Sequence, residues 1–316
     1  MVIDDRQRRA YAYCERVARS HYENFPVASL LLPATMRPHI AAVYAFARRA
    51  DDFADEPGIA DDERIRLLDD WGVRLHDSAC RAEARVESTR EGGALGAGRP
   101  ALAGDGDPDD LIFEALGTTI KECALPMSLF EDLLSAFRQD VETTRYESWE
   151  QLLDYCRRSA NPIGRLVLRI AGYVGDEVVQ RADAVCPALQ LTNFWQDLAI
   201  DWRRGRLYLP LDTVSAAGAL EADLDAGRIT PAWSEALGAV TSRTRALFDD
   251  GRSVCDLVEG RLRYELRVTW LGGRLVLDRL VSSGFDVFAA RPAIGRRDAP
   301  ALAWQALRWP RDLVKA

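Results

Sequence analysis

The sequence predicts an all-α protein. Apolar residues recur at spacings of three and four through most of the chain, alanine, leucine and arginine dominate the composition, and alternating pieces such as Leu207–Leu209 are too short for the core of a sheet. Helices are expected at residues 4–22, 37–56, 61–84, 108–124, 127–144, 148–160, 163–174, 177–203, 230–257 and 260–283, with ends placed to within about 2–4 residues.

Recognisable signals bound several of these helices. The helix at 37–56 follows the hydroxyl of Thr35, a candidate cap, and carries Pro38 in its first turn. Residues 85–107 contain six glycines and are interpreted as a mobile loop between two helices. No domain boundary is placed in that loop, because the acidic helix before it is expected to work with residues far beyond it. The predicted organisation is one domain over 1–285 and a basic tail over 286–316.

The composition excludes several classes of protein. A net charge of −8 argues against reading a phosphate backbone over a broad surface, and no run approaches the roughly 20 apolar residues of a membrane helix. Six cysteines without C-x-x-C spacing, and a beginning without an apolar signal core, favour reduced thiols in a cytoplasm.

Common catalytic motifs are also missing from the sequence. Only three histidines occur, without an H-E-x-x-H spacing, so a histidine-ligated zinc centre is not expected. The chain contains no phosphate-binding P-loop, no G-x-G-x-x-G dinucleotide fingerprint and no G-x-S-x-G nucleophile elbow. The candidate chemistry therefore has to come from other residues.

Two predicted helices carry carboxylates along one stripe. In the first helix, Ile40, Tyr44 and Ala47 lead into Asp51 and Asp55 by steps of three and four, so an apolar face ends in two aspartates. In the second helix, Asn193, Asp197 and Asp201 follow each other by steps of four, after the uncharged stretch 184–196.

Carboxylates at this spacing oppose helix formation, and they cost more beside an apolar face unless a cation neutralises them. Mg²⁺ is a suitable cation, because it takes one or two carboxylates together with phosphate oxygens. The alternative for the first stripe is a solvated helix end of the kind formed by Asp61–Glu63. Together the two stripes suggest an α-helical site for a metal and a diphosphate.

The residues around both stripes resemble the squalene/phytoene synthase family, the head-to-head isoprenoid synthases. His21–Phe25, Leu30–Pro33 and Val43–Arg48 running into Asp51–Asp55 resemble the first motif of that family. Leu189–Asn193 running into Asp197 and Asp201, followed by Arg206–Pro210, resembles the second motif. The resemblance covers roughly residues 10–285. It implies a single-domain isoprenoid synthase fold, with helices around a central cavity and two facing aspartate-rich helices.

The resemblance also implies roles for individual residues. The expected Mg²⁺ ligands are Asp51, Asp52, Asp55, Asn193, Asp197 and Asp201. The expected substrate-binding residues are His21, Phe25, Tyr44, Arg48, Asn193, Gln196, Arg206 and Tyr208. Tyr155 and Asn161 join the motif aspartates Asp51, Asp55, Asp197 and Asp201 as expected catalytic residues. For the two arginines the alternative is a local ion pair, in particular that of Arg48 with Asp51 or Asp52.

Two departures from the condensing members of the family select a reaction. Ser159–Gly164 replaces a segment of small apolar residues, and Gln196 stands where an arginine usually precedes the second motif. Both changes resemble the bacterial hydroxysqualene synthases of hopanoid pathways. The resemblance therefore implies that presqualene diphosphate and water give hydroxysqualene and diphosphate, with Mg²⁺ and without NADPH.

Such a reaction needs an apolar, aromatic wall and a place for one water molecule. Candidates for the wall are Phe25, Tyr44, Phe46, Tyr155, Phe194 and Trp195, whose alternative is ordinary core packing. Ser159 and Asn161 are candidates for seating the water, since Pro162 cannot donate a backbone hydrogen bond and disfavours helix before it. The alternative for Asn161 is a cap on the helix that follows.

Two other functions remain open. The chain could be a head-to-head condensing enzyme that makes presqualene diphosphate, squalene or phytoene. It could also be a non-catalytic relative that serves assembly or lipid binding, although a scaffold has no reason to keep four aspartates on apolar helix faces. A small prenyl diphosphate is the expected partner and nucleic acid is not.

The end of the chain differs from the rest in charge. Residues 261–316 carry 11 basic and 5 acidic side chains, and beyond residue 284 the basic ones are interleaved with aromatic residues. This mixture suits an anionic lipid surface, and its alternative is a solvated, partly disordered terminus. The location hypothesis is cytoplasmic, with peripheral contact to the inner membrane through the tail.

Overall fold

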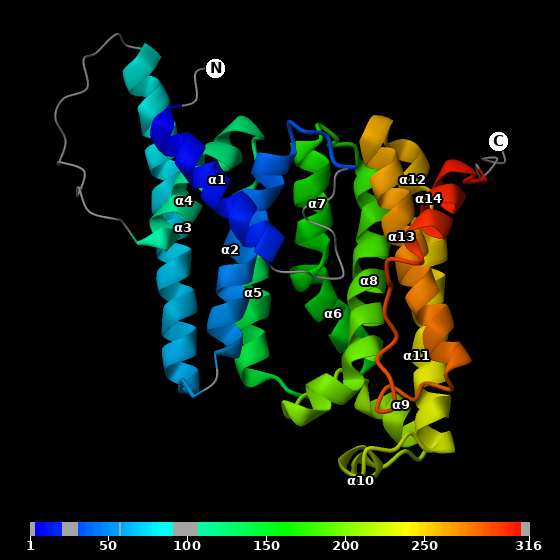
Figure 1. Cartoon of the computed structure of the whole chain (residues 1–316). Coiled ribbons are helices and arrows are strands. Elements are labelled where there is room, and N and C mark those ends of the chain that lie inside the picture. The colour runs from blue at the N-terminus through cyan, green and yellow to red at the C-terminus, as the bar shows by residue number, and fades with distance from the viewer. Residues whose placement is uncertain (1–3, 21–30, 57, 91–106, 311–316) are drawn as a thin grey trace. The chain divides into compact units, whose positions relative to one another are not determined.

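The protein folds into α-helices, as the sequence predicts. The computed structural model describes residues 4–20, 31–56, 58–90 and 107–310 (Figure 1). These residues form two compact units, one from the first 141 residues with 166–172 and one from 142–165 with 173 onward. Within the described residues no strand occurs, and the pairing at Arg145 and Leu207 is an isolated bridge.

The first unit packs five helices around an aromatic centre. Its helices are α1 (Asp5–Ser20), α2 (Arg37–Asp55), α3 (Asp61–Arg90), α4 (Pro108–Glu122) and α5 (Met127–Glu142). Phe46 of α2 lies with its ring centroid 5.8 Å from that of Trp71 on α3 and 5.6 Å from that of Phe130 on α5. Phe113 of α4 packs on Trp71 at 4.4 Å. Burial of these large rings is the main apolar contribution to this unit.

The second unit is built around α8 (Asp176–Arg203), which packs against α6, α11, α12 and α13 (Figure 1). The remaining helices of this unit are α6 (Trp149–Ser159), α9 (Leu211–Ala216), α10 (Glu221–Asp225), α11 (Pro231–Gly251), α12 (Val254–Leu257), α13 (Gly260–Ser282) and α14 (Ala299–Leu307). The indole N–H of Trp195 donates to Thr244 Oγ1 over 2.9 Å, which ties α8 to α11 through a buried polar pair. The first five residues of α7 (Asn161–Ile170) belong to this unit, and its other residues belong to the first unit.

Several sequence expectations need correction. Thr35 does not cap α2: the N-cap position is Met36, which has no side-chain cap hydrogen bond, although Pro38 does lie in the first turn. The helix expected to end at residue 84 continues to Arg90, because residues 85–90 contain no glycine or proline. The rest of the expected glycine loop lies outside the described residues.

The C-terminal part of the chain forms more structure than a tail. Residues 286–310 belong to the second unit, and they include α14, which packs against α13. The helix was missed because it is nine residues long, near the lower limit at which periodicity is informative. The division into a domain at 1–285 and a tail at 286–316 stays a prediction.

Close approach of α8 and α11 depends on Gly251, the last residue of α11. A Cβ at this position would lie 2.5 Å from Val185 Cγ2 and 2.6 Å from the carbonyl oxygen of Arg181, and a backbone carbonyl cannot turn aside as a side chain can. Gly251→Ala should therefore lower the free energy of unfolding by about 1–3 kcal/mol, measured by urea denaturation.

The matched control lies in the same helix. Gly238 has no atom within 4 Å of a Cβ added to it. Gly238→Ala should be neutral or stabilising by about 0.5–1 kcal/mol, because alanine restricts the unfolded chain. Equal effects of the two substitutions would contradict the close packing at Gly251.

Candidate functional site

The acidic stripe of α2 lies at its half-buried face. Tyr44, Asp51 and Asp55 are half-buried, whereas Phe46 and Ala50, on the other side of the helix, are fully buried. The stripe therefore lies where the periodicity places it, between core and solvent. Carboxylates in this position are partly desolvated and need a counter-charge.

Arg48 supplies a counter-charge from the same helix. Its Nη2 donates to Asp52 Oδ1 over 2.6 Å, and its Nη1 donates to Asp51 Oδ2 over 3.3 Å. This is the local ion pair that was one of the two alternatives for Arg48. It also holds a guanidinium directly beside the first aspartate motif, where a planar donor can bind phosphate oxygens. Contact with a diphosphate stays a prediction.

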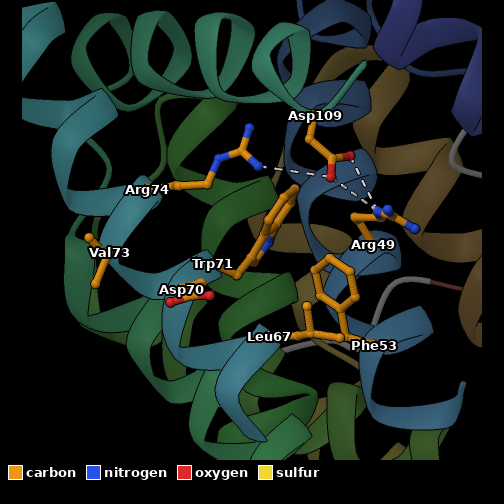
Figure 2. A pocket seen from close by; sticks show the side chains of 8 residues that line it. All are labelled: Arg49, Phe53, Leu67, Asp70, Trp71, Val73, Arg74 and Asp109. Atoms are coloured by element: carbon orange, nitrogen blue, oxygen red, sulfur yellow. Dashed lines mark hydrogen bonds and ion pairs between the residues drawn. The ribbon is translucent and has the colours of Figure 1, made fainter. Parts of the chain in front are cut away.

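A depression of about 480 Å³ lies on the opposite side of α2, and Figure 2 shows the side chains that line it. Asp109 accepts from Arg49 Nε over 3.2 Å and lies 4.0 Å from Arg74, so that α2, α3 and α4 are joined by charges. Arg49 and Phe53 each lie two residues from Asp51, roughly 200° around the helix. The depression is therefore separate from the acidic stripe, and its arginines are occupied with Asp109.

Burial raises the pKa of the Asp109 carboxyl above its ordinary value, and the neighbouring Arg49 acts in the opposite direction. The same arginine lies over the ring of Phe53, with its guanidinium carbon 4.7 Å from the centroid. The side chains that line the depression therefore contact one another and help to pack the helices of the first unit.

The second acidic stripe occupies the accessible face of α8. Asn193, Asp197 and Asp201 are half-buried, as are Cys186 and Leu189 upstream on the same face, while the residues between them are mostly buried. In a helix that is packed on its other sides, this is the face that can receive a ligand. The sequence predicted the same face, because the uncharged residues 184–196 precede Asp197 and Asp201.

Arg291, which the sequence analysis did not assign to the site, binds Asp197. Its Nε and Nη2 both donate to the carboxylate, the second over 3.1 Å, and the side chains are 36% and 15% exposed. The hydrogen bond that Arg291 donates to Asp197 raises the pKa of Arg291, burial opposes this, and the charges of Asp197 and Asp201 add to it. A cationic group is thus already held at the second motif by Asp197. Charge counting placed Arg291 in a basic tail and gave no signal for its partner.

The segment around Arg291 is attached to α8 at a second point. Gln196 is 2% exposed and donates from Nε2 to the carbonyl oxygen of Pro292. Farther along, Asp298 accepts from Arg279 Nη1 and Nη2 over 3.0 and 2.5 Å. Gln196, expected at the substrate, therefore positions the segment that carries Arg291, and its substrate contact stays a prediction.

Tyr155 and Tyr208, both expected at the site, come together with Phe194. The rings of Phe194 and Tyr208 stack with centroids 3.7 Å apart and planes within 4° of parallel. Tyr155 lies 6.1 Å from Phe194, and Tyr146, which the sequence analysis missed, lies 5.5 Å from Tyr155. This aromatic cluster consists of Tyr146, Tyr155, Phe194 and Tyr208, and Phe194 directly follows Asn193 on α8. All four residues are buried, so the contacts within the cluster are also core contacts of the second unit, and a role of Tyr155 and Phe194 in a cavity wall stays a prediction.

The other candidate residues of the site do not belong to this aromatic cluster. Phe46 and Trp195 are fully buried and are engaged in core contacts within their units, so their alternative of ordinary packing is the observed one. His21 and Phe25 lie outside the described residues. Arg206 follows α8, and its backbone N–H donates to the carbonyl oxygen of Asp201 over 2.9 Å, which places it next to the second motif.

Ser159 and Asn161 lie at the break between α6 and α7. Asn161 is 6% exposed, and its Oδ1, like Ser159 Oγ, is buried without a hydrogen-bond partner among the described residues. A capping asparagine accepts a backbone N–H with that same oxygen. Asn161 Oδ1 therefore does not cap α7, and the break presents two buried polar atoms one turn after Tyr155.

The oxygen donors of the two motifs suit a hard divalent cation. Among the described residues no three histidine, cysteine, aspartate or glutamate side chains are gathered into a metal-binding group. Mg²⁺ does not require such a group, since one or two carboxylates and substrate phosphates suffice. The ion pair of Arg291 with Asp197 shows that this stripe attracts positive charge, and the residues fit the ion.

The pairing of Arg291 with Asp197 can be measured by a double-mutant cycle. Arg291→Gln, Asp197→Asn and the double variant should reveal a coupling of about 1 kcal/mol in urea denaturation, reduced at high salt because the pair is partly exposed. The control cycle uses Arg157 and Asp154, whose side chains are both more than half exposed. A coupling no larger than that of the control pair would show that Arg291 does not hold Asp197 in solution.

Comparisons with known proteins identify the family. A family model described as squalene/phytoene synthase matches residues 18–298. A hydroxysqualene synthase of Rhodopseudomonas palustris is 36% identical over 78% of this chain and 75% of its own length, and phytoene synthase 1 of Arabidopsis thaliana is 27% identical over 91% of this chain and 63% of its own. The crystal structure of squalene synthase HpnC from Alicyclobacillus acidocaldarius covers 88% of this chain and 95% of its own, with a TM-score of 0.73 and 38% identity. An all-α chain with both aspartate stripes in order and a match over most of its length belongs to the squalene/phytoene synthase family.

Proposed function

We propose that the protein is a hydroxysqualene synthase, which converts presqualene diphosphate and water to hydroxysqualene and diphosphate. The similarity to the Rhodopseudomonas enzyme of that name supports this reaction within the family. The observation that carries the choice is the pair of buried polar atoms, Ser159 Oγ and Asn161 Oδ1, at the break between α6 and α7. Buried polar groups in proteins are almost always hydrogen-bonded, so each of these two atoms, two residues apart in the chain, needs a partner.

A water molecule is the partner that this reaction requires. A buried water needs a polar site with two or more hydrogen-bonding groups, and the hydroxyl and the amide oxygen provide them. Held in this way, the water has its hydrogens on Asn161 Oδ1 and Ser159 Oγ and its lone pair directed elsewhere. Its oxygen is then oriented for attack on a cation, while other water is excluded by the buried surroundings.

The aromatic cluster of Tyr146, Tyr155, Phe194 and Tyr208 suits the cationic intermediate. Aromatic faces attract positive charge electrostatically, by about 2 kcal/mol or more where water is excluded. Tyr155 lies on α6 one turn before Ser159, so the cluster and the buried polar atoms share one region of the second unit. A hydrocarbon cation at this wall would meet one nucleophile, the water beside Asn161.

The aspartates and arginines act on the leaving group. Bound Mg²⁺ would neutralise the diphosphate and make its departure easier. Arg48, held beside Asp51 and Asp52, can donate to the diphosphate oxygens, and Arg291 brings a second guanidinium to Asp197. These donors are charged at every working pH, so they stabilise the released anion without a proton transfer.

The proposed reaction balances with water as its only co-reactant. The carbon–oxygen bond to diphosphate breaks with its electron pair on the diphosphate, and the carbon skeleton rearranges as a cation. The oxygen of water then forms the new carbon–oxygen bond, and one proton is released to solvent. No oxidant or reductant takes part, which is why NADPH is not expected.

A condensing reaction is the alternative within the family. The phytoene synthase similarity extends over 91% of this chain, and the Alicyclobacillus structure carries the name of a squalene synthase. Incubation with farnesyl or geranylgeranyl diphosphate alone separates the two reactions. A head-to-head hydrocarbon or presqualene diphosphate as the product would replace the hydration proposal.

The first test concerns the two acidic stripes. Asp51→Asn and Asp197→Asn should each lower turnover of presqualene diphosphate by at least about a hundredfold, because each removes a charge from the group that neutralises the leaving anion. The helical circular dichroism should stay unchanged. Asp62→Asn, at the exposed start of α3, is the control and should retain full turnover. EDTA should abolish wild-type activity and Mg²⁺ should restore it; an active enzyme in EDTA contradicts the metal assignment.

The second test follows the water. Oxygen from ¹⁸O-labelled water should appear in a C30 alcohol, and NADPH should change neither the product nor its rate. Asn161→Leu, which keeps the volume and removes the amide, should lower the alcohol yield about tenfold, as expected for loss of a buried hydrogen bond. It should not lower the free energy of unfolding, because the oxygen it removes has no protein partner among the described residues.

The outcomes of this test distinguish the hydration mechanism from the role of Asn161 in binding the water. Alcohol without ¹⁸O, or squalene formed with NADPH, would exclude the hydration mechanism. Labelled alcohol at the normal yield from Asn161→Leu would keep the mechanism and remove Asn161 from it.

A further inference from the structure

α14 has an apolar face that is mostly exposed in the described structure. Leu302, Ala306 and the following Trp309 are buried and form one stripe, at steps of four and three. Pro300, Trp304 and Leu307 form a second stripe at the same steps, and Trp304 and Leu307 are 56% and 64% exposed. The helix contains no charged residue. A helix that is apolar on both sides normally has a partner on both sides.

The exposed stripe is held in place by partly or fully buried contacts at both ends of the helix. Before α14, Asp298 is bound by Arg279. After it, Trp309 Nε1 donates to Asp256 Oδ2 over 3.3 Å, and the ring packs edge-on against Trp270 at 5.2 Å. Arg267, 6% exposed, donates to the carbonyl oxygen of Ala306 over 3.3 Å. The stripe is therefore a rigid surface, so little ordering entropy opposes its binding.

Basic side chains surround this stripe. Arg296 and Arg297 are exposed before the helix, and Arg308 is exposed after it, with its guanidinium carbon 4.4 Å from the centroid of Trp304. None of the three has an acidic partner among the described residues. Asp298, the one acidic residue from 296 to 310, is occupied by Arg279. The surface therefore combines exposed apolar side chains with unbalanced positive charge, in a chain whose net charge is −8.

We propose that this face of α14 docks onto an anionic lipid surface. Tryptophan and leucine enter the boundary between headgroups and acyl chains, where the indole ring is favoured, and arginines bind anionic headgroups beside them. In this arrangement α14 lies along the membrane surface, and only the side chains of its exposed face enter the lipid. In the described part of the chain no helix is long and apolar enough to cross a membrane, so this contact is peripheral.

Charge favours lipid over a second copy of the chain as the occupant. A copy brings another basic α14 in a symmetric contact, and like charges would then oppose each other. An anionic membrane brings the opposite charge over the whole surface. The proposal does not depend on the reaction, because it concerns residues that are distinct from both aspartate stripes and from the α6–α7 break.

Vesicle flotation with the full-length protein tests the proposal. Wild type should float with vesicles of phosphatidylglycerol and phosphatidylcholine, and Trp304→Ser with Leu307→Ser should weaken binding about tenfold or more. Arg296→Gln with Arg297→Gln should weaken binding to these vesicles about fivefold per arginine, and should not change binding to pure phosphatidylcholine. Point variants are required, because truncation after residue 284 would also remove Arg291 and the buried contacts of α14.

The matched control removes exposed apolar residues elsewhere in the same unit. Val174→Ser with Leu220→Ser replaces side chains that are 63% and 65% exposed and should float like wild type. Circular dichroism and thermal unfolding verify that all variants fold. Brominated lipids should quench wild-type tryptophan fluorescence more than that of Trp304→Phe, which shows directly that this indole enters the lipid.

Three results would overturn the proposal. They are failure of the wild type to float, flotation of the Trp304 and Leu307 double variant as strong as that of wild type, and a loss of binding in the Val174 and Leu220 control as large as that in the Trp304 and Leu307 variant. If the Trp304 and Leu307 variant instead converts a dimer to a monomer in sedimentation without changing flotation, the face is a contact between copies of the chain and the lipid proposal is wrong.

Discussion

Negative charge on half-buried helix faces is the constraint on which the rest of the site depends. Each aspartate stripe places carboxylates where solvent screens them poorly, and each is balanced by an arginine. In α2 the balance comes from Arg48, three and four residues before Asp51 and Asp52. In α8 it comes from Arg291, 94 residues beyond Asp197. The first solution is local to one helix, and the second binds a distant segment to the site.

The second solution gives the C-terminal segment its place. Arg291 on Asp197 and Gln196 on the Pro292 carbonyl attach residues 291–292 to α8, and Arg279 on Asp298 attaches the end of the same segment to α13. The chain then enters α14 in a defined direction, and the contacts of Trp309 with Asp256 and Trp270 hold the C-terminal end of that helix. The contacts of Arg291 and Gln196 with α8 are thus followed along the chain by those that hold α14. The candidate site and the exposed face of α14 are therefore joined by one continuous segment of the chain.

The periodicity of apolar and acidic residues in the sequence was enough to predict the long helices and the faces that carry the aspartates. The long helices and the two carboxylate stripes follow from side-chain spacing, and eight of the ten expected helices appear within four residues of their expected bounds. The exceptions are α3, which continues six residues past its expected end, and the helix expected at 230–257, which ends at Gly251 and is followed by the separate α12. Short helices such as α9 and α12 span too few residues for a period to show. The partner of Asp197 could not be found either, because charge counting gives an excess of arginines beyond residue 284 but not the carboxylate that each one meets. The Thr35 cap failed for a related reason: a capping residue type is necessary for the hydrogen bond but does not ensure it.

The α6–α7 break shows where sequence and structure together go further than either alone. Pro162 makes a break there predictable, and a break alone would be satisfied by an asparagine that caps the next helix. The structure removes that explanation, because Asn161 Oδ1 makes no such hydrogen bond. Burying an unpaired amide oxygen costs about 1–3 kcal/mol, and an apolar residue of the same size would avoid the cost. Local violations of this kind concentrate at functional sites, where a group is kept for what it binds and not for what it stabilises. Since Ser159 lies one turn after Tyr155 and Asn161 two residues farther on, the ligand we propose for these atoms is a small hydrogen-bonding molecule beside the aromatic cluster, and water is the smallest such molecule.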